Sequence, residues 1–191
     1  MPKPFLVVAF GGTLRPKSST ELLLGALLRL AEDRGAQTRL FSGAGLNFPM
    51  YAPNQSAARS DIVEFLATLR QADAIIMGSP GYHGGVSGLV KNAIDYTEEL
   101  ALDARPYFSG RPVGCVASAF DSQSGYATLQ ALRNVTHALK GWPIPQGIVL
   151  TTRVRAFDDE GACSDGEIAA QMAGMMGEIM AFLRDGARKM R

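Results

Sequence analysis

Three short, almost entirely apolar runs constrain the fold of this chain more than any other feature of its sequence. They cover residues 5–10, 72–78 and 113–117, and each has proline or glycine at one boundary. A strand that is apolar along its whole length is buried on both faces, as in parallel sheets covered by helices. The runs therefore predict the central strands of a parallel sheet.

The segments between these runs have the periodicity of helices. Apolar residues recur at i, i+3 and i+4 over residues 22–31 and 86–97. Further helical patterns cover residues 61–70, 123–139 and 164–188, and weaker strand patterns lie near residues 38–41 and 147–151. Five strands that alternate with five helices predict a doubly wound α/β fold. Because no segment resembles a linker, we expect one domain over residues 1–191.

Charge, cysteine content and hydropathy narrow the class of protein. The 19 Lys and Arg nearly balance the 18 Asp and Glu, and the net charge of +1 gives no reason to expect nucleic acid or a membrane as partner. Cys115 and Cys163 have neither metal-ligand spacing nor the density of a disulfide framework. No apolar run approaches the roughly 18 residues of a membrane span, and the first is too short for a secretory signal. We therefore expect a cytoplasmic protein without a metal site.

The loop after the first apolar run combines glycines, hydroxyl groups and cations. In a doubly wound sheet the ligand lies outside the carboxyl ends of the strands, where this loop must be. A helix follows it, and helix N-terminal amides favour anions. The side chains that could hold a phosphate are Thr13, Arg15, Ser18, Ser19 and Thr20. The alternative is that Ser18 or Ser19 is only the N-cap of the helix.

The same loop lacks the common nucleotide-binding motifs. Neither G-x-x-x-x-G-K-[ST] nor G-x-G-x-x-G occurs in it. A hydroxyl-rich loop without those glycines suits a monophosphate ester such as FMN better than a pyrophosphate. The flavodoxin-like version of the fold, a five-stranded parallel sheet of order 2-1-3-4-5 with helices on both faces, binds FMN at this point. We predict this version.

A second loop, residues 79–96, follows the apolar run at 72–78. Pro80 and the neighbouring glycines predict a turn whose backbone can approach a flat ring, and Tyr82 and His83 offer planar and polar contacts.

Together, the two loops resemble those of the NADPH-dependent FMN reductase family, which includes quinone, azo-dye and chromate reductases. In this family the first loop has the sequence motif G-S-x-R-x-x-S-x-[NT]. Its positions are occupied here by Gly12, Thr13, Arg15, Ser18 and Thr20. Its second motif contains [ST]-P-x-Y and ends in K-N-[AL]-[IL]-D-[WY], which residues 79–96 match from Ser79-Pro80 to Asp95-Tyr96. Both motifs lie after the expected strands, so the joint signal is specific.

The resemblance implies an oxidoreductase in which NADPH or NADH reduces FMN, and electrons then pass to free flavin, a quinone or a similar small acceptor. It assigns the phosphate to the first loop and the flavin ring to the second. The implied ring-side residues are Pro80, Gly81, Tyr82, His83 and Gly84, with Ser118 and Gly125 from the loop after the fourth strand. That loop departs from the family's glycine-rich pattern at Phe120 and Asp121. No segment presents an evident clamp for an adenosine phosphate, so the donor is open between NADPH and NADH.

Hydride transfer between nicotinamide and flavin is chemistry of the two rings, so no catalytic side chain is required. His83 is a candidate proton donor or simply a loop residue, and His137 is assigned a structural role. The rival hypothesis is a flavodoxin-like electron carrier without NAD(P)H oxidase activity of its own. Such carriers are strongly acidic, so the near-neutral charge favours the enzyme. A flavin-free relative is a third possibility.

The helical patterns at residues 86–99 and 164–188 carry more apolar surface than one small sheet needs. They predict a homodimer or homotetramer, as the resemblance also implies. The methionines of the last helix are assigned to the core or to a subunit contact. Residues 42–55, with Phe48 and Tyr51, are either a wall for the flavin of a neighbouring chain or a self-contained loop.

Overall fold

The computed structural model describes residues 3–53, 59–158 and 160–189, without the side chains of 187–189. Its parallel sheet has the order β2 (Gln37–Phe41), β1 (Leu6–Gly11), β3 (Ala74–Tyr82), β5 (Pro112–Ala119). The next position is shared by β6 (Trp142–Pro143), which pairs with the start of β5, and β7 (Ile148–Thr151), which pairs with its end. Prolines between residues 142 and 148 divide this last strand of the sheet into β6 and β7, because proline has no amide hydrogen to donate to a neighbouring strand. The predicted order 2-1-3-4-5 is confirmed.

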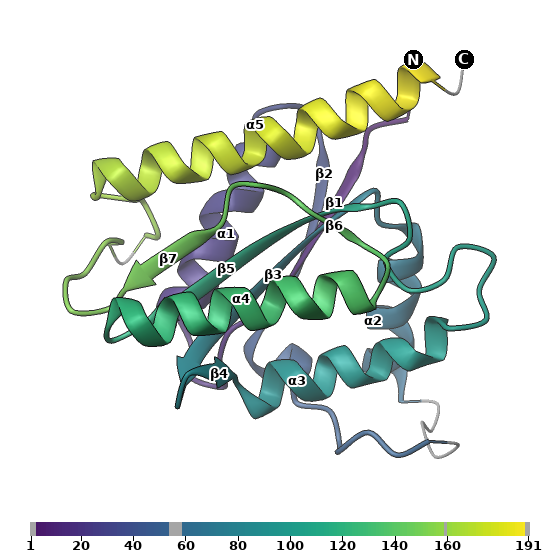
Figure 1. Cartoon of the computed structure of the whole chain (residues 1–191), viewed down its shortest axis with the longest axis horizontal. Helices are drawn as coiled ribbons and strands as arrows, with labels where there is room; N and C mark the ends of the chain where they lie inside the picture. Colours follow the sequence, from purple (N-terminus) through teal and green to yellow (C-terminus); the bar gives the residue numbers. More distant parts are fainter. Residues whose placement is uncertain (1–2, 54–58, 159, 190–191) are drawn as a thin grey trace.

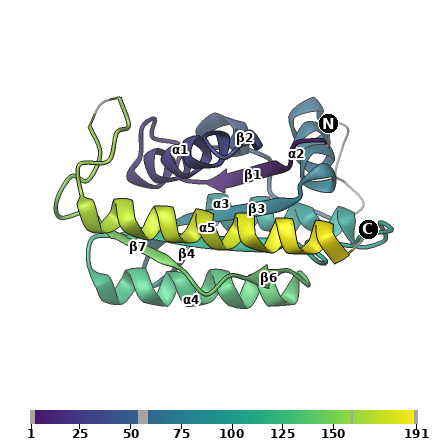
Figure 2. The same ribbon diagram turned by 90° about the horizontal axis from the view of Figure 1, so that it is seen from above.

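Helices cover both faces of the sheet, as Figures 1 and 2 show. On one face lie α1 (Ser19–Glu32) and α5 (Gly166–Lys189). On the other lie α2 (Ser60–Gln71), α3 (Gly88–Asp95) and α4 (Ser122–Ala138). No helix in the described part of the chain is long and apolar enough to cross a membrane.

The apolar runs in the sequence arise because each central strand contributes to two cores. In β1, Val7 and Ala9 belong to the cluster under α1 and α5, whereas Val8 and Phe10 belong to the cluster under α2, α3 and α4. All four side chains are fully buried. Side chains of a strand alternate between its faces, so a strand covered on both faces must be apolar throughout.

Asn92 makes three of the hydrogen bonds that hold the loop between β2 and α2. Asn92 of α3 donates from Nδ2 to the carbonyl oxygens of Phe48 and Pro49, and its Oδ1 accepts from the amide of Tyr51. Phe48 is buried, and Met50 is 80% exposed. The loop also contains the short 3-10 helix η1 (Gly43–Leu46). Residues 54 and 55, which end the loop expected from the sequence, lie outside the described residues.

The helix expected from residue 86 begins later than its sequence pattern indicates. The chain runs from β3 through His83 and Gly84, with φ of 53° and 74°, into the short antiparallel strand β4 (Gly85–Val86). Consecutive positive φ values are those of a type I′ hairpin turn. Ser87 then caps α3 by accepting from the amide of Val90 at 3.3 Å. A 3-10 helix, η2 (Tyr96–Leu100), extends α3.

Phe65 of α2 is the centre of an aromatic cluster in the core beneath that helix. Its ring makes edge contacts with Phe10 and Phe41, with centroids 5.4 and 5.2 Å apart, and a tilted contact with Phe48 at 5.4 Å. Phe65 is fully buried. Edge-to-face geometry is favourable for aromatic rings, so the cluster joins α2, β1, β2 and the loop after β2.

We expect Phe65→Ala to lower the free energy of unfolding by about 3–5 kcal/mol, because it removes a buried ring and leaves a cavity. Val63→Ala in the same helix is the matched control. Val63 is 54% exposed, so its truncation should change stability by less than about 0.5 kcal/mol. Urea denaturation followed by circular dichroism measures both. Similar losses for the two variants would show that Phe65 is not a central contact.

Candidate functional site

The site begins where β1 and β3 end side by side. Gly11 pairs with Gly78, and a Cβ on Gly11 would lie 1.9 Å from the carbonyl oxygen of Gly78. Gly11 also has a φ of 149°, which side chains rarely allow. The amide of Gly12 then donates to the same oxygen at 3.3 Å. This close approach directs the loop of residues 12–18 across the carboxyl ends of the strands.

Helix α1 begins directly after this loop. Ser18 is its N-cap: the side-chain oxygen accepts from the amide of Glu21 at 3.3 Å, and the carbonyl oxygen accepts from the amide of Leu22 at 2.9 Å. Ser18 is therefore the N-cap of this helix, which was the alternative role expected from the sequence. An α-helix supplies no carbonyl partner for its first amides, so those of Ser19 and Thr20 are directed at whatever lies before the helix. With the helix dipole, they favour an anion there.

The other hydroxyl groups of the loop have separate roles. Thr20 Oγ1 lies 2.5 Å from Ser118 Oγ, and this buried pair joins α1 to the end of β5. Thr13 Oγ1 accepts from the amide of Arg15 at 3.1 Å and so shapes the loop. Arg15 itself is exposed. The guanidinium of Arg15 and the amides of Ser19 and Thr20 therefore lie around one space at the start of α1.

That space is a cavity of about 230 Å³ at the carboxyl edge of the sheet. Nine of the residues predicted from the sequence line it: Thr13, Arg15, Ser18, Ser19, Thr20, Pro80, Gly81, Tyr82 and Ser118. Ligand pockets that enclose a drug-sized molecule usually measure about 300–1,000 Å³. A cavity below that range can hold one end of a larger ligand and cover one side of the rest.

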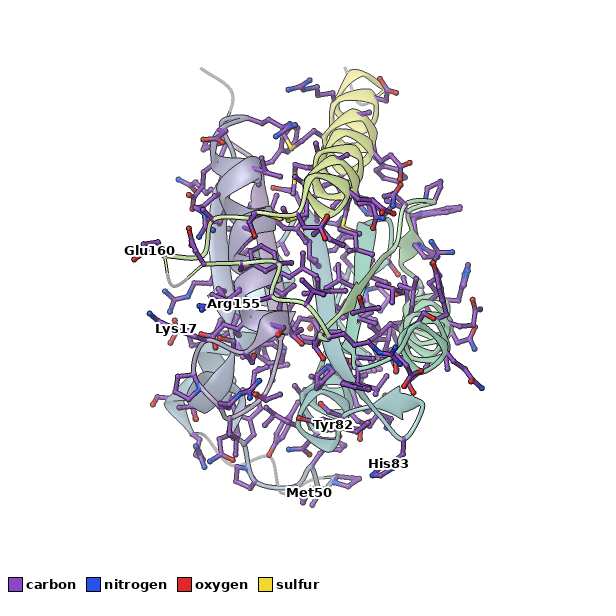
Figure 3. The ribbon with its side chains drawn as sticks, turned by 90° about the vertical axis from the view of Figure 1, so that its left-hand side faces the viewer. Lys17, Met50, Tyr82, His83, Arg155 and Glu160 are labelled. Carbon is purple, nitrogen blue, oxygen red and sulfur yellow. The ribbon has the colours of Figure 1, made fainter. Side chains whose placement is uncertain are left out.

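Three predicted residues are not brought to the cavity. His83 and Gly84 form the tip of the hairpin between β3 and β4, and Figure 3 shows His83 at this outer end. Gly125 is buried in α4, where a Cβ would lie 2.3 Å from Cγ1 of Val149. Gly125 is thus required for the packing of α4 against β7. Gly81, which does line the cavity, is also close to α4, since its Cβ would lie 2.8 Å from Thr128 Oγ1.

The structure adds three residues to the cavity: Ala119, Phe120 and Thr152. The phenyl ring of Phe120 is part of an exposed wall, with 67% of the residue accessible. Asp121 caps α4 instead, accepting from the amide of Ser124 at 2.8 Å and from its hydroxyl at 3.1 Å. The amide of Ser124 is the main reason that the pKa of Asp121 lies below its ordinary value. Thr152 could have been predicted, because it directly follows the strand beside β5.

Two further observations concern metals and thiols. Among the described residues, no group of three or more His, Cys, Asp and Glu side chains could hold a metal ion. Burial raises the pKa of Cys115 to about 11, so this thiol is protonated and unreactive at neutral pH.

The sequence model of the family described as NADPH-dependent FMN reductase matches residues 5–155, which contain every residue of the cavity. The chain belongs to this NADPH-dependent FMN reductase family. Membership assigns FMN as the cofactor and a reduced pyridine nucleotide as the electron donor. The cavity fits FMN, because helix-terminal amides and Arg15 can hold a phosphate while the end of β3 covers one side of a ring.

Two curated relatives show how this chain compares with known flavoproteins. An iron-sulfur flavoprotein of Archaeoglobus fulgidus is 28% identical over 127 residues, which are 63% of this chain and 65% of the relative. The chain thus matches somewhat less than two thirds of that protein's length. An FMN-dependent NADPH-azoreductase of Staphylococcus aureus is 27% identical over 142 residues, 73% of this chain and 72% of the relative.

Solved structures share the fold of this chain at lower sequence identity. The flavoenzyme NAD(P)H:(acceptor) oxidoreductase FerB of Paracoccus denitrificans has a TM-score of 0.71 at 18% identity, covering 95% of this chain and 98% of its own. A WrbA-like flavodoxin of Agrobacterium tumefaciens has a TM-score of 0.64 at 18% identity, with coverage of 95% and 99%. The flavodoxin-like fold is confirmed.

The approach of Gly11 to Gly78 generates a stability prediction. Gly11→Ala should lower the free energy of unfolding by about 2–5 kcal/mol, because the new Cβ meets backbone atoms and φ is unfavourable for alanine. Gly88→Ala, at the start of α3 with no atom within 4 Å of the new Cβ, should be nearly neutral. Chemical denaturation of both variants checks this, and equal stabilities would contradict the close approach.

Proposed function

We propose that this protein is an NAD(P)H-dependent oxidoreductase that holds FMN in the cavity at the ends of β1, β3 and β5. Residues 1–191 act as one FMN-binding domain. The electrons go to a small acceptor such as free flavin or a quinone. The observation that carries the proposal is the cavity itself: amides and a cation at one end, and the main chain of β3 at the other, in a chain of this reductase family.

The phosphate end is built from α1 and the loop before it. The amides of Ser19 and Thr20 and the guanidinium of Arg15 hold the phosphate, and Ser18, whose oxygen already accepts from Glu21, can still donate its hydroxyl hydrogen. Because the helix terminus and its cap are fixed by the fold, these donors are in place before the ligand arrives. The phosphate therefore sets the position of the whole cofactor.

The ring end is built from Pro80, Gly81 and Tyr82, with Ser118 and Phe120 on the neighbouring strand end. Ser79 Oγ accepts from the amide of Ser87 at 2.9 Å, which ties the base of the hairpin and fixes this edge. Bound FMN supplies hydride-accepting and electron-donating chemistry through its flavin ring. The residues of the cavity cover one face of that ring and keep the other open to the donor and then to the acceptor.

Exposed apolar side chains surround the cavity and support a homodimer or homotetramer. Leu14, Tyr82 and Phe120 are each more than half exposed, Met50 is exposed on the loop after β2, and Tyr126 is exposed in the first turns of α4. A second copy of the chain would bury such side chains favourably. In that assembly, the loop of residues 42–53 is the candidate wall for a neighbour's flavin.

Arg15→Ala should weaken FMN binding by about 1–3 kcal/mol, because it removes a charge-assisted contact with the phosphate. Ser19→Ala should weaken it less, since the Ser19 amide remains. Arg39→Ala is the control: this exposed arginine of β2 pairs with Glu64, away from the cavity. Fluorescence titration measures all three affinities. Unchanged binding by Arg15→Ala would place the phosphate elsewhere.

Tyr82→Ala should shift the flavin absorbance spectrum and slow steady-state NADPH oxidation with a quinone, while FMN affinity falls only about two- to ten-fold. His83→Ala is the matched control at the next position, outside the cavity. It should leave both the spectrum and the turnover unchanged. If the wild-type protein binds FMN but does not turn over NADPH, the electron-carrier hypothesis replaces the enzyme. If Tyr82→Ala has no effect, the ring lies elsewhere.

A further inference from the structure

A second cavity, of about 520 Å³, adjoins the flavin cavity at the end of β7. It lies between the loop before α1 and the segment of residues 150–158. The two cavities share Arg15, Ser19 and Thr152 in their linings. Arg15 and Ser19 belong to the phosphate end of the flavin cavity. At the ring end, the connection is made by Thr152, whose amide donates to the carbonyl oxygen of Ala119 at 2.8 Å, and by Arg153, which contacts Phe120.

The second cavity has more basic than acidic side chains among the described residues of its lining. The basic residues are Arg15, Lys17, Arg153 and Arg155, and the acidic residue is Asp158. Asp158 Oδ1 accepts from the amides of Glu160 and Ala162, at 3.1 and 2.7 Å, so this carboxylate has partners within its own loop. Because Arg15 is assigned to the FMN phosphate in the proposed site, the attraction for a second anionic group comes mainly from Arg153 and Arg155 of the segment after β7.

The loop that carries Arg153 and Arg155 is anchored, although it contains no helix. Phe157 is buried in the core under α1 and α5 and pairs with Cys163 in an isolated antiparallel bridge. The amide of Ser164 donates to the carbonyl oxygen of Ala156 at 2.9 Å. These contacts fix the backbone at residues 156–157 and 163–164. The arginines are therefore presented from an ordered support.

Both guanidinium groups are oriented by main-chain contacts. Arg153 Nε donates to the carbonyl oxygen of Phe120 at 3.2 Å, and its guanidinium carbon lies 4.9 Å from the centroid of the Phe120 ring. Arg155 Nε donates to the carbonyl oxygen of Phe157 at 2.7 Å. Figure 3 shows Arg155 and Lys17 on the same side of the molecule, away from the hairpin of Tyr82 and His83. Arg153 and Phe120 form the boundary between the two cavities.

We propose that this cationic cavity binds the phosphate groups of the adenosine half of the reduced pyridine nucleotide. The nicotinamide then reaches the flavin cavity past Phe120, and Arg153 and Arg155 contact phosphate oxygens in the second cavity. Arginine suits this task because its planar fork matches phosphate oxygens. The inference rests on the proposed FMN site, and it explains how a chain without a recognisable nucleotide motif can favour NADPH, which carries one phosphate more than NADH.

The test uses Arg153→Gln, Arg155→Gln and the double variant, each loaded with FMN. Anaerobic stopped-flow reduction gives the dissociation constants of NADPH, NADH and reduced nicotinamide mononucleotide. The double variant should bind NADPH about 10- to 100-fold more weakly, as expected for lost charge-assisted contacts, and the mononucleotide equally well. Both of the following results support the site: loss for NADPH alone assigns the arginines to the 2′-phosphate, and equal loss for NADH assigns them to the pyrophosphate.

Calorimetric titration with adenosine 2′,5′-bisphosphate provides a readout that does not depend on flavin reduction. The wild-type protein should bind this probe, and the double variant should lose about ten-fold or more in affinity. Arg39→Gln removes the same charge from β2 and should leave the affinity unchanged. Since Arg153 and Arg155 are exposed, the variants should fold, and thermal melting checks this.

The proposal is overturned if the double variant binds NADPH as well as the wild type does, or if NADPH and the mononucleotide lose affinity equally. FMN titration of the same proteins separates this failure from that of the proposed function. A wild-type protein that takes up FMN and is reduced by NADPH, with variants that behave identically, refutes only the second cavity. A wild-type protein that takes up no FMN refutes the flavin site.

Discussion

Both faces of the parallel sheet are buried under helices, and this constraint determines where the protein can place polar groups. From Val7 to Phe10 of β1 and from Ala74 to Met77 of β3, every side chain is buried in one of the two cores, so a polar side chain there would disturb the packing. The polar residues therefore gather where the strands end and the loops begin. The contact between Gly11 and Gly78 brings two such ends within hydrogen-bonding distance, and the loop to α1 starts from there.

The site that results is made largely of main chain. Ser18 caps α1, Thr13 shapes the loop, and Thr20 joins α1 to β5 through Ser118, so these hydroxyl groups first build the cradle. In the proposed site, helix-terminal amides and Arg15 bind the anion, and the fold positions the amides before any ligand is present. In the proposed function, this division explains why no cluster of catalytic side chains is needed, because the rings of the cofactor and donor carry the chemistry and the protein orients them.

The sequence predicted the sheet order and most of the cavity, because both follow from periodicity and from residues directly after strands. Prediction from the sequence failed where contacts between distant segments determine the local structure. The pairing of β4 with the end of β3 places Val86 in a strand and delays the start of the helix that its pattern indicates, and Gly125 is explained only by its approach to Val149. The sequence did not single out Arg153 and Arg155, the residues of the proposed second phosphate site, because the anchoring of Phe157 that presents them depends on packing under α1 and α5.

The central claim is that the amino-terminal end of α1 recognises the phosphate of FMN. Calorimetric titration of the protein with FMN and with riboflavin, which differ only in that phosphate, tests it most directly. Several charge-assisted hydrogen bonds predict that FMN binds at least about 100-fold more tightly than riboflavin. Equal affinities for the two flavins would contradict the account.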